Sequence, residues 1–274
     1  MTNVTVPGQR LAQEWRDPLA RVGLVAKGVL YLILGLLAIQ FARGNTSSDE
    51  VSEAGAFEKL AAQPFGKFLL VALVVGLLAL TIWHVMQAFT GDPVEGDEAT
   101  DKLKYAGKAI TYGVMTFSAF KIARDSWSGG EAQAESGNEQ NQQAASFLFD
   151  LPAGAFLVGL LGVVLLGIAA YQFYKYVYNT EHMERIAAPG QTASTLRTMG
   201  RVGYFARGTV VAISGIFFIV AAVQHDPDES KGLSGALAEL AQNDWGRIIL
   251  WLTAVGLVLF GIFCFAEAKY RRAT

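Results

Sequence analysis

The sequence predicts an all-α integral membrane protein with six transmembrane helices, arranged as three parallel two-helix repeats. Three observations favour this fold class. Of the 274 residues, 52% are hydrophobic and 17% are charged, which is too apolar for an ordinary soluble domain. Long runs of the chain carry no charged side chain, and a hydrocarbon core of about 30 Å needs about 20 helical residues to cross it. An internal repeat then sets the number of helices.

Four uncharged runs predict spans directly, at 68–91, 151–174, 208–224 and 248–266. A fifth span includes 28–42 and extends back to Val22, which takes in only Lys27, whose long stem lets its ammonium reach the headgroups. The sixth, 105–123, has the shortest uncharged core, because Lys108 and Lys121 flank it. We place the six helices at about 22–42, 67–90, 105–123, 152–176, 202–224 and 247–268.

The sixth helix is supported by the repeat. Residues 21–28 recur as 201–208 at an offset of 180, and the glycines at 35, 66 and 76 recur at the same offset. A copy between them aligns Lys108 with Lys27 and Tyr112 with Tyr31 at an offset of 81, while its second helix aligns at an offset of 88. The repeats cover about 19–91, 101–178 and 199–272, and they follow a polar tail, 1–18, that we expect in the cytoplasm.

The first and third repeats share a pattern of basic, aromatic and glycine residues. It consists of Arg21, Gly23, Lys27, Gly28, Tyr31 and Gly35, and of Arg201, Gly203, Tyr204, Arg207, Gly208 and Gly215. With this pattern the chain resembles the bacterial membrane proteins catalogued as domain of unknown function 1206, whose members carry three such repeats. The middle copy departs from it, with Lys102, Lys104 and Ala109 in place of arginine, glycine and glycine. The resemblance implies membrane location and this architecture, and it implies no activity.

Positive charge is distributed unevenly between the two sides that six spans define. The side with both termini carries 15 lysines and arginines, and the other side carries 7. Cytoplasmic segments of membrane proteins are enriched in these residues. We therefore expect a multi-pass protein of the bacterial cytoplasmic membrane, with both termini in the cytoplasm.

The outer connections contain two short amphipathic stretches, 55–62 and 233–241, whose apolar residues recur three and four apart. We interpret each as a short surface helix that closes a hairpin. The alternative is a helix lying flat at the membrane interface. The middle connection, 128–145, is rich in Gly, Glu, Gln and Asn, and we expect it to be disordered.

The cytoplasmic ends of the six helices bring polar side chains into one layer. Its members are Lys27, Lys108, Arg207, His84, Gln87, Gln172, Lys175 and Glu267. Because Glu267 is the only acid in the layer and a buried unpaired charge is costly, we expect it to pair with Arg207. The surplus cations suit the phosphate of an anionic lipid. A simpler interpretation is that each cation anchors its own helix to the lipid headgroups.

Two further features have both a structural and a functional interpretation. His84 is either a neutral histidine hydrogen-bonded between helices, which we favour, or a proton relay or substrate contact. Small residues seven apart on the first helices, such as Gly28 and Gly35, favour close helix packing. The alternative for the glycines is a passage for a solute.

The sequence contains none of the common motifs of catalytic or metal sites. It contains no CxxC, HExxH, GxxxxGK[ST] or GxSxG pattern, and its three histidines are far apart. Cys264 is the only cysteine, so no intrachain disulfide forms, and the net charge of −2 argues against nucleic-acid binding. We expect no metal and no cofactor.

We therefore predict a non-catalytic membrane protein. It is a structural or accessory component, or it binds anionic lipid at the cytoplasmic face. Its expected partners are membrane lipids, with other membrane proteins or further copies of the chain as additional candidates. The alternative is a transporter or channel for a small solute or ion.

Overall fold

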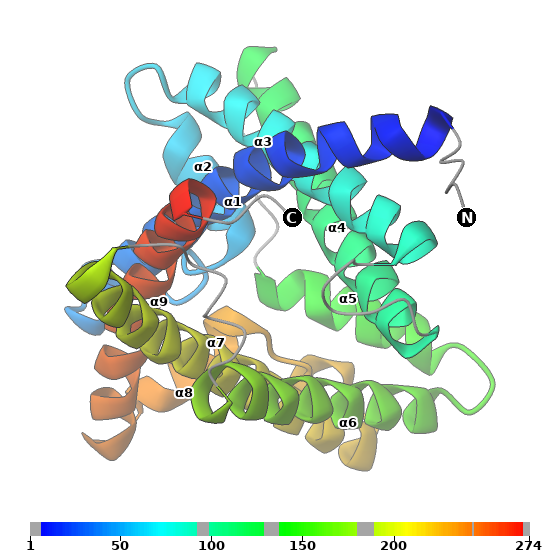
Figure 1. Cartoon of the computed structure of the whole chain (residues 1–274). Coiled ribbons are helices and arrows are strands. Elements are labelled where there is room, and N and C mark those ends of the chain that lie inside the picture. Colours follow the sequence, from blue (N-terminus) through cyan, green and yellow to red (C-terminus); the bar gives the residue numbers. More distant parts are fainter. Residues whose placement is uncertain (1–6, 92–98, 129–136, 180–188, 243, 271–274) are drawn as a thin grey trace.

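The computed structural model describes residues 7–91, 99–128, 137–179, 189–242 and 244–270, and within these ranges it is helical and contains no strand (Figure 1). The long helices are α1 (Pro7–Ala42), α3 (Gly66–Thr90), α4 (Ala99–Trp127), α6 (Gly154–Gln172), α7 (Gly190–Gln224) and α9 (Asp244–Tyr270). The short helices are α2 (Glu53–Ala61), α5 (Gly137–Phe149) and α8 (Leu233–Ala241). A π-helix, η1 (Phe173–Tyr178), continues α6, and a 3₁₀ turn, η3 (Pro227–Glu229), precedes α8. Each repeat is thus a long helix, a short helix and a long helix.

The all-α prediction is confirmed, and the described residues include five helices that are long and apolar enough to cross a membrane. These helices cover residues 18–42, 66–90, 154–178, 191–224 and 244–270. The sixth predicted span lies in α4, which is less apolar than the other five. Its 29 residues extend about 43 Å at 1.5 Å per residue, which is long enough to cross a bilayer.

Residues 7–18 of the polar tail continue α1 as helix, and Pro18 lies inside that helix. One expectation about the connections needs correction. The middle connection was expected to be disordered, but α5 covers residues 137–149. Its Ala145 is fully buried, and Gln142 donates a hydrogen bond to the backbone oxygen of Asp228, at 3.1 Å. Contacts with α6, α8 and η3 stabilise this polar segment, and composition alone does not reveal them.

The short helices α2 and α8 cover the ends of their hairpins. Ser52 begins α2 as its N-cap, because its hydroxyl accepts a hydrogen bond from the Gly55 N–H at 3.0 Å. The apolar face of α2 then turns inward, with Phe57 fully buried. In α8, Leu237 is buried in the same way. These helices close the hairpins, as we favoured, and their apolar faces pack on protein.

The repeats pack together through the second helix of one and the first helix of the next. In this way α3 packs on α4, α6 on α7, and α9 on α1 (Figure 1). Within the first repeat α1 also packs on α3, and within the third α7 packs on α9. Among the described residues of the second repeat, α4 and α6 do not form such a packed pair. The long helices therefore follow one another in the order α4, α3, α1, α9, α7, α6, with a seam between the first and the last.

Glycines explain why the two long helices pack together in the first repeat and in the third. A Cβ atom on Gly23 of α1 would lie 2.7 Å from the Cβ of Leu80 on α3, and a Cβ on Gly76 would collide with Ala26. The third repeat has the same arrangement, with Gly203 against Phe260 and Gly256 against Ala206. In the second repeat the aligned positions carry Lys104 and Val164. Without glycine at either position, α4 and α6 lack the close approach seen in the other repeats.

The contacts between repeats also use the predicted glycines. A Cβ on Gly28 would lie 3.0 Å from the backbone oxygen of Gly261, and one on Gly35 would lie 2.7 Å from the backbone nitrogen of Val258. On α7, Gly215 meets Gly162 of α6 in the same way. The interpretation of these glycines as helix-packing residues is confirmed.

Candidate functional site

Two cations of the predicted layer meet in the interior of the bundle. Lys27 of α1 is buried, with 8% of its surface exposed, and its Nζ lies 4.9 Å from the centre of the Phe260 ring on α9. The guanidinium of Arg207 on α7 is half-buried and lies 5.8 Å from the same ring and 5.8 Å from the ring of Tyr31. Attraction to the faces of these rings offsets part of the cost of holding two positive charges side by side.

Tyrosines from four elements surround this pair of cations. The strongest electrostatic neighbours of Arg207 are Tyr31 on α1, Tyr112 on α4, Tyr204 on α7 and Tyr176 on η1. Tyr31 and Tyr112 are also neighbours of Lys27, together with Cys264 and Arg207 itself. A neutral phenol donates one hydrogen bond and accepts others. The interior therefore offers two positive charges and several hydroxyl donors in one place.

Lys27 and Arg207 form no hydrogen bond and no ion pair with any residue in the described part of the chain. The expected pair between Arg207 and Glu267 is therefore wrong, because the guanidinium lies over the rings of Tyr31 and Phe260 instead. Glu267 of α9 acts electrostatically on Tyr204 and Cys264. From the other end of the bundle, Glu53 of α2 acts on Arg207 and Tyr31.

His84 and Gln87 belong to a neighbouring cluster on α3. Both are buried, and the Nδ1 of His84 lies 2.9 Å from the Oε1 of Gln87, so this hydrogen bond is within one helix and not between helices. The imidazole ring contacts α4 by stacking on Tyr112 and Tyr105, with ring centres 5.3 and 6.3 Å apart. Lys108 extends the cluster, since its Nζ lies 5.0 Å from the centre of the Tyr105 ring.

Gln172 and Lys175 lie where α6 changes into the π-helix η1. Lys175 is half-buried, with its Nζ 5.3 Å from the ring of Tyr171 and 5.7 Å from that of Tyr176. Gln172 is buried, and its Oε1 has no hydrogen-bond partner within the described ranges. A buried carbonyl oxygen without a donor costs about 1–3 kcal/mol.

The structure thus separates the eight predicted residues. It brings Lys27 and Arg207 together and places Glu267 near their aromatic neighbours. His84, Gln87 and Lys108 form a second cluster, and Gln172 and Lys175 lie on the last turns of the fourth long helix. Sequence reasoning missed the rings and Glu53. One signal was present, since Tyr31 and Tyr112 align in the repeat and share a buried position.

Comparison with known proteins identifies the family. The family described as Domain of Unknown Function (DUF1206) matches residues 22–91, 103–179 and 202–271. The chain belongs to this family. Each matched segment covers most of one long–short–long unit of helices, so the resemblance inferred from the residue pattern is confirmed. The chain is also similar to the uncharacterized protein YxxB of Bacillus subtilis (strain 168), with 30% identity over 267 residues, which is 95% of this chain and 93% of that protein. No solved structure matches the chain.

Proposed function

We propose that this DUF1206 protein is a non-catalytic membrane protein that binds the phosphate of an anionic lipid headgroup between Lys27 and Arg207. The observation that carries this proposal is the pair of inward-facing cations that form no ion pair with the described residues. Uncompensated charge inside a membrane protein is costly. A phosphate between the two cations supplies the compensation and makes charge-assisted hydrogen bonds with both.

The neighbouring groups suit a phosphate. Phenol hydroxyls such as those of Tyr31 and Tyr204 donate hydrogen bonds to phosphate oxygens. A free inorganic phosphate shares this chemistry with a lipid headgroup, so a test must present the two separately.

The proposed membrane topology places this layer toward the cytoplasm. We assign α4 as the sixth span because it packs along α3 and is long enough to cross the bilayer. With six spans, the side rich in Lys and Arg faces the cytoplasm, together with both termini. The cytoplasmic leaflet of such membranes carries anionic lipids.

The test measures ligand-induced stabilisation of the full chain in nanodiscs of phosphatidylcholine. One arm adds phosphatidylglycerol to the nanodisc, and the other adds inorganic phosphate to the buffer. We expect phosphatidylglycerol to raise the unfolding midpoint, because a ligand that binds only the folded state stabilises it. The variant Lys27→Gln/Arg207→Gln should show a smaller rise than the wild-type protein, while Arg197→Gln/Arg201→Gln, which changes two exposed arginines of α7, should show the full rise.

A rise caused by inorganic phosphate alone would replace the lipid headgroup with a free anion as the ligand. No rise in either arm with the wild-type protein would overturn anion binding at this layer. An equal rise in the wild-type protein and in Lys27→Gln/Arg207→Gln would place the lipid elsewhere.

Transport of a small anion is a second candidate, because the seam between α4 and α6 adjoins the same layer. Tyr112 on α4 and Tyr176 on η1 both neighbour Arg207, yet their helices do not pack together in the described part of the chain. A transporter should move phosphate or chloride into liposomes, and Arg207→Gln should abolish that flux. Liposomes with no flux above protein-free controls would exclude this alternative.

A further inference from the structure

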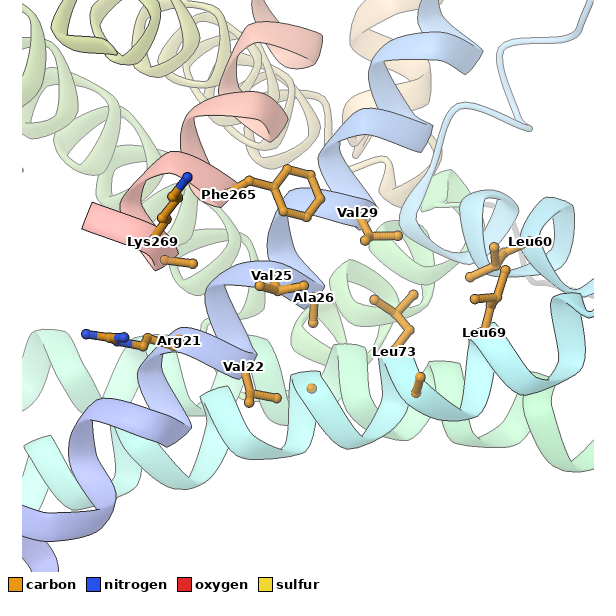
Figure 2. A pocket seen from close by; sticks show the side chains of 13 residues that line it. Arg21, Val22, Val25, Ala26, Val29, Leu60, Leu69, Leu73, Phe265 and Lys269 are labelled. Atoms are coloured by element: carbon orange, nitrogen blue, oxygen red, sulfur yellow. The ribbon is translucent and has the colours of Figure 1, made fainter. Parts of the chain in front are cut away.

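A groove with a volume of about 500 Å³ opens on the outer face of α1, α3 and α9 (Figure 2). Its walls are apolar along most of their length, with Val25 on α1, Leu73 on α3 and Phe265 on α9. Arg21 and Lys269 lie at one end, and Leu60 lies at the other (Figure 2). The groove is therefore cationic at one end and apolar beyond it.

Small residues create this groove. Gly76 of α3 lies against Ala26 of α1, so the two backbones are close and no long side chain fills the surface above their contact. On the other side, Phe265 of α9 packs over Gly28 of α1 and forms a wall. The hollow is thus a consequence of the same helix packing that closes the first repeat.

The cationic end faces outward and has no acidic partner among the described residues. Arg21 and Lys269 are exposed, and neither takes part in an ion pair within the described ranges. They come from different helices, α1 and α9, and both lie at the same end of the groove (Figure 2). Lysine and arginine side chains at one end of an apolar groove attract the negative charge of a phosphodiester.

We propose that this groove binds one anionic phospholipid, with its phosphate at Arg21 and Lys269 and one acyl chain along the apolar walls. From Arg21 to Val29 the helix rises about 12 Å at 1.5 Å per residue, close to the thickness of one leaflet of a core of about 30 Å. The volume lies within the range of about 300–1,000 Å³ typical of small-molecule sites. This site is separate from the layer at Lys27 and Arg207 and does not depend on it.

Native mass spectrometry of the full chain, exchanged into phosphatidylglycerol or phosphatidylcholine, tests this proposal. The variant Ala72→Phe fills the groove without changing charge, and Arg21→Gln/Lys269→Gln removes the cations while keeping the apolar walls. We expect Ala72→Phe to retain one phospholipid fewer than the wild-type protein. We expect Arg21→Gln/Lys269→Gln to lose the preference for phosphatidylglycerol over phosphatidylcholine.

Matched controls lie outside the groove. Ala170→Phe adds the same ring at an exposed position of α6, and Lys102→Gln/Arg197→Gln removes two cations from other helices. Both should retain lipid as the wild-type protein does. The variant Lys27→Gln/Arg207→Gln should keep the lipid that Ala72→Phe loses, so failure of one site is distinguishable from failure of the other. Equal lipid retention by Ala72→Phe and the wild-type protein would overturn the groove proposal, as would the same loss in Ala170→Phe.

Discussion

The ring of Tyr176 stacks on the ring of Tyr204, with centres 3.9 Å apart and planes 5° from parallel. Tyr176 belongs to the π-helix that ends the second repeat, and Tyr204 belongs to the first helix of the third. Tyr204 in turn meets Phe260 edge to face, at 4.9 Å. A continuous aromatic contact therefore links three of the long helical segments beside Arg207. π-helical turns occur frequently at functional sites, and this one supplies a ring to the proposed anion site.

Replacing Tyr176 by leucine should destabilise the protein. The change removes a buried stacked pair, which contributes about 0.5–1.5 kcal/mol beyond the area it buries. The measurement is the unfolding midpoint of the purified protein in detergent. Tyr178→Leu is the control, because that side chain is 82% exposed. Equal midpoints for Tyr176→Leu and Tyr178→Leu would show that the stack contributes nothing.

Gly256→Ala should also lower stability, by about 1–3 kcal/mol, because the added methyl collides with Ala206 at the contact of α7 and α9. Gly167→Ala is the matched change on α6, where no heavy atom lies within 4 Å of an added Cβ. That control should be neutral or slightly stabilising, since alanine favours helix more than glycine does. Thermal unfolding of the two variants side by side makes the comparison, and the opposite order would contradict it.

The hydrogen bond between His84 and Gln87 should appear as coupling between the two residues. Gln87→Leu removes the acceptor from a buried imidazole and should cost about 1–3 kcal/mol. His84→Phe keeps a ring to stack on Tyr112 but leaves the amide of Gln87 without this partner. The double variant should therefore lose less stability than the sum of the single losses. Additive losses in chemical unfolding would indicate that the two side chains act independently.

Glu53 should make stability depend on pH. Burial raises the pKa of its carboxyl group above the ordinary value of 4.5, against smaller opposing effects of a backbone hydrogen bond and of Arg207. The unfolded chain releases this proton first, so the stability associated with the neutral carboxyl is complete below pH 4.5 and is lost as the pH rises toward the folded-state pKa.

The corresponding experiment compares Glu53→Gln with the wild-type protein across that pH range. Because glutamine does not ionise, the variant should gain unfolding temperature relative to the wild-type protein at pH 7 and less so at pH 4. Glu58→Gln, an exposed change on the same helix, serves as the control. A difference between Glu53→Gln and the wild-type protein that does not vary with pH would rule out this titration.

The proposed topology makes a prediction about the C-terminus. Green fluorescent protein fused after residue 274 should fluoresce, because it folds in the bacterial cytoplasm, and alkaline phosphatase at the same place should be inactive. Fusions after Thr46, in the outer connection of the first repeat, should give the reverse result. Active alkaline phosphatase at the C-terminus would contradict the proposed topology, since it would require either an odd number of spans or both termini on the outer side.

Much of the fold follows from simple patterns in the sequence. Uncharged runs identify five of the long helices, and the offset of 180 identifies the glycines that pack them. The middle repeat is harder to predict, because its first helix is less apolar and its outer connection is polar. Helix α5 forms from that polar segment through contacts with distant parts of the chain, such as the one between Gln142 and Asp228. Local composition contains no information about such contacts.

The sequence predicts where Lys27 and Arg207 lie, but it does not predict which groups they contact. Helix direction and spacing are enough to place Lys27 and Arg207 in one layer. The direction in which Arg207 points depends on rings from other helices, so the simplest rule, that a cation pairs with the nearest acid, selected Glu267 incorrectly. The aromatic partners were overlooked because Phe260 has no special signal in an apolar helix that contains several similar residues.

The seam between α4 and α6 makes the molecule less symmetric than its three repeats. The two long helices pack closely at two aligned glycines in the first repeat and in the third. The second repeat has Lys104 and Val164 at those positions. Among the described residues, glycines bring backbones close together where α1 packs on α3 and α9, and where α7 packs on α6 and α9, but not between α4 and α6. Across this seam, the Nζ of Lys104 on α4 lies 5.0 Å from the centre of the Tyr171 ring on α6. The six long helices therefore form an open arc rather than a closed ring, with its gap between α4 and α6.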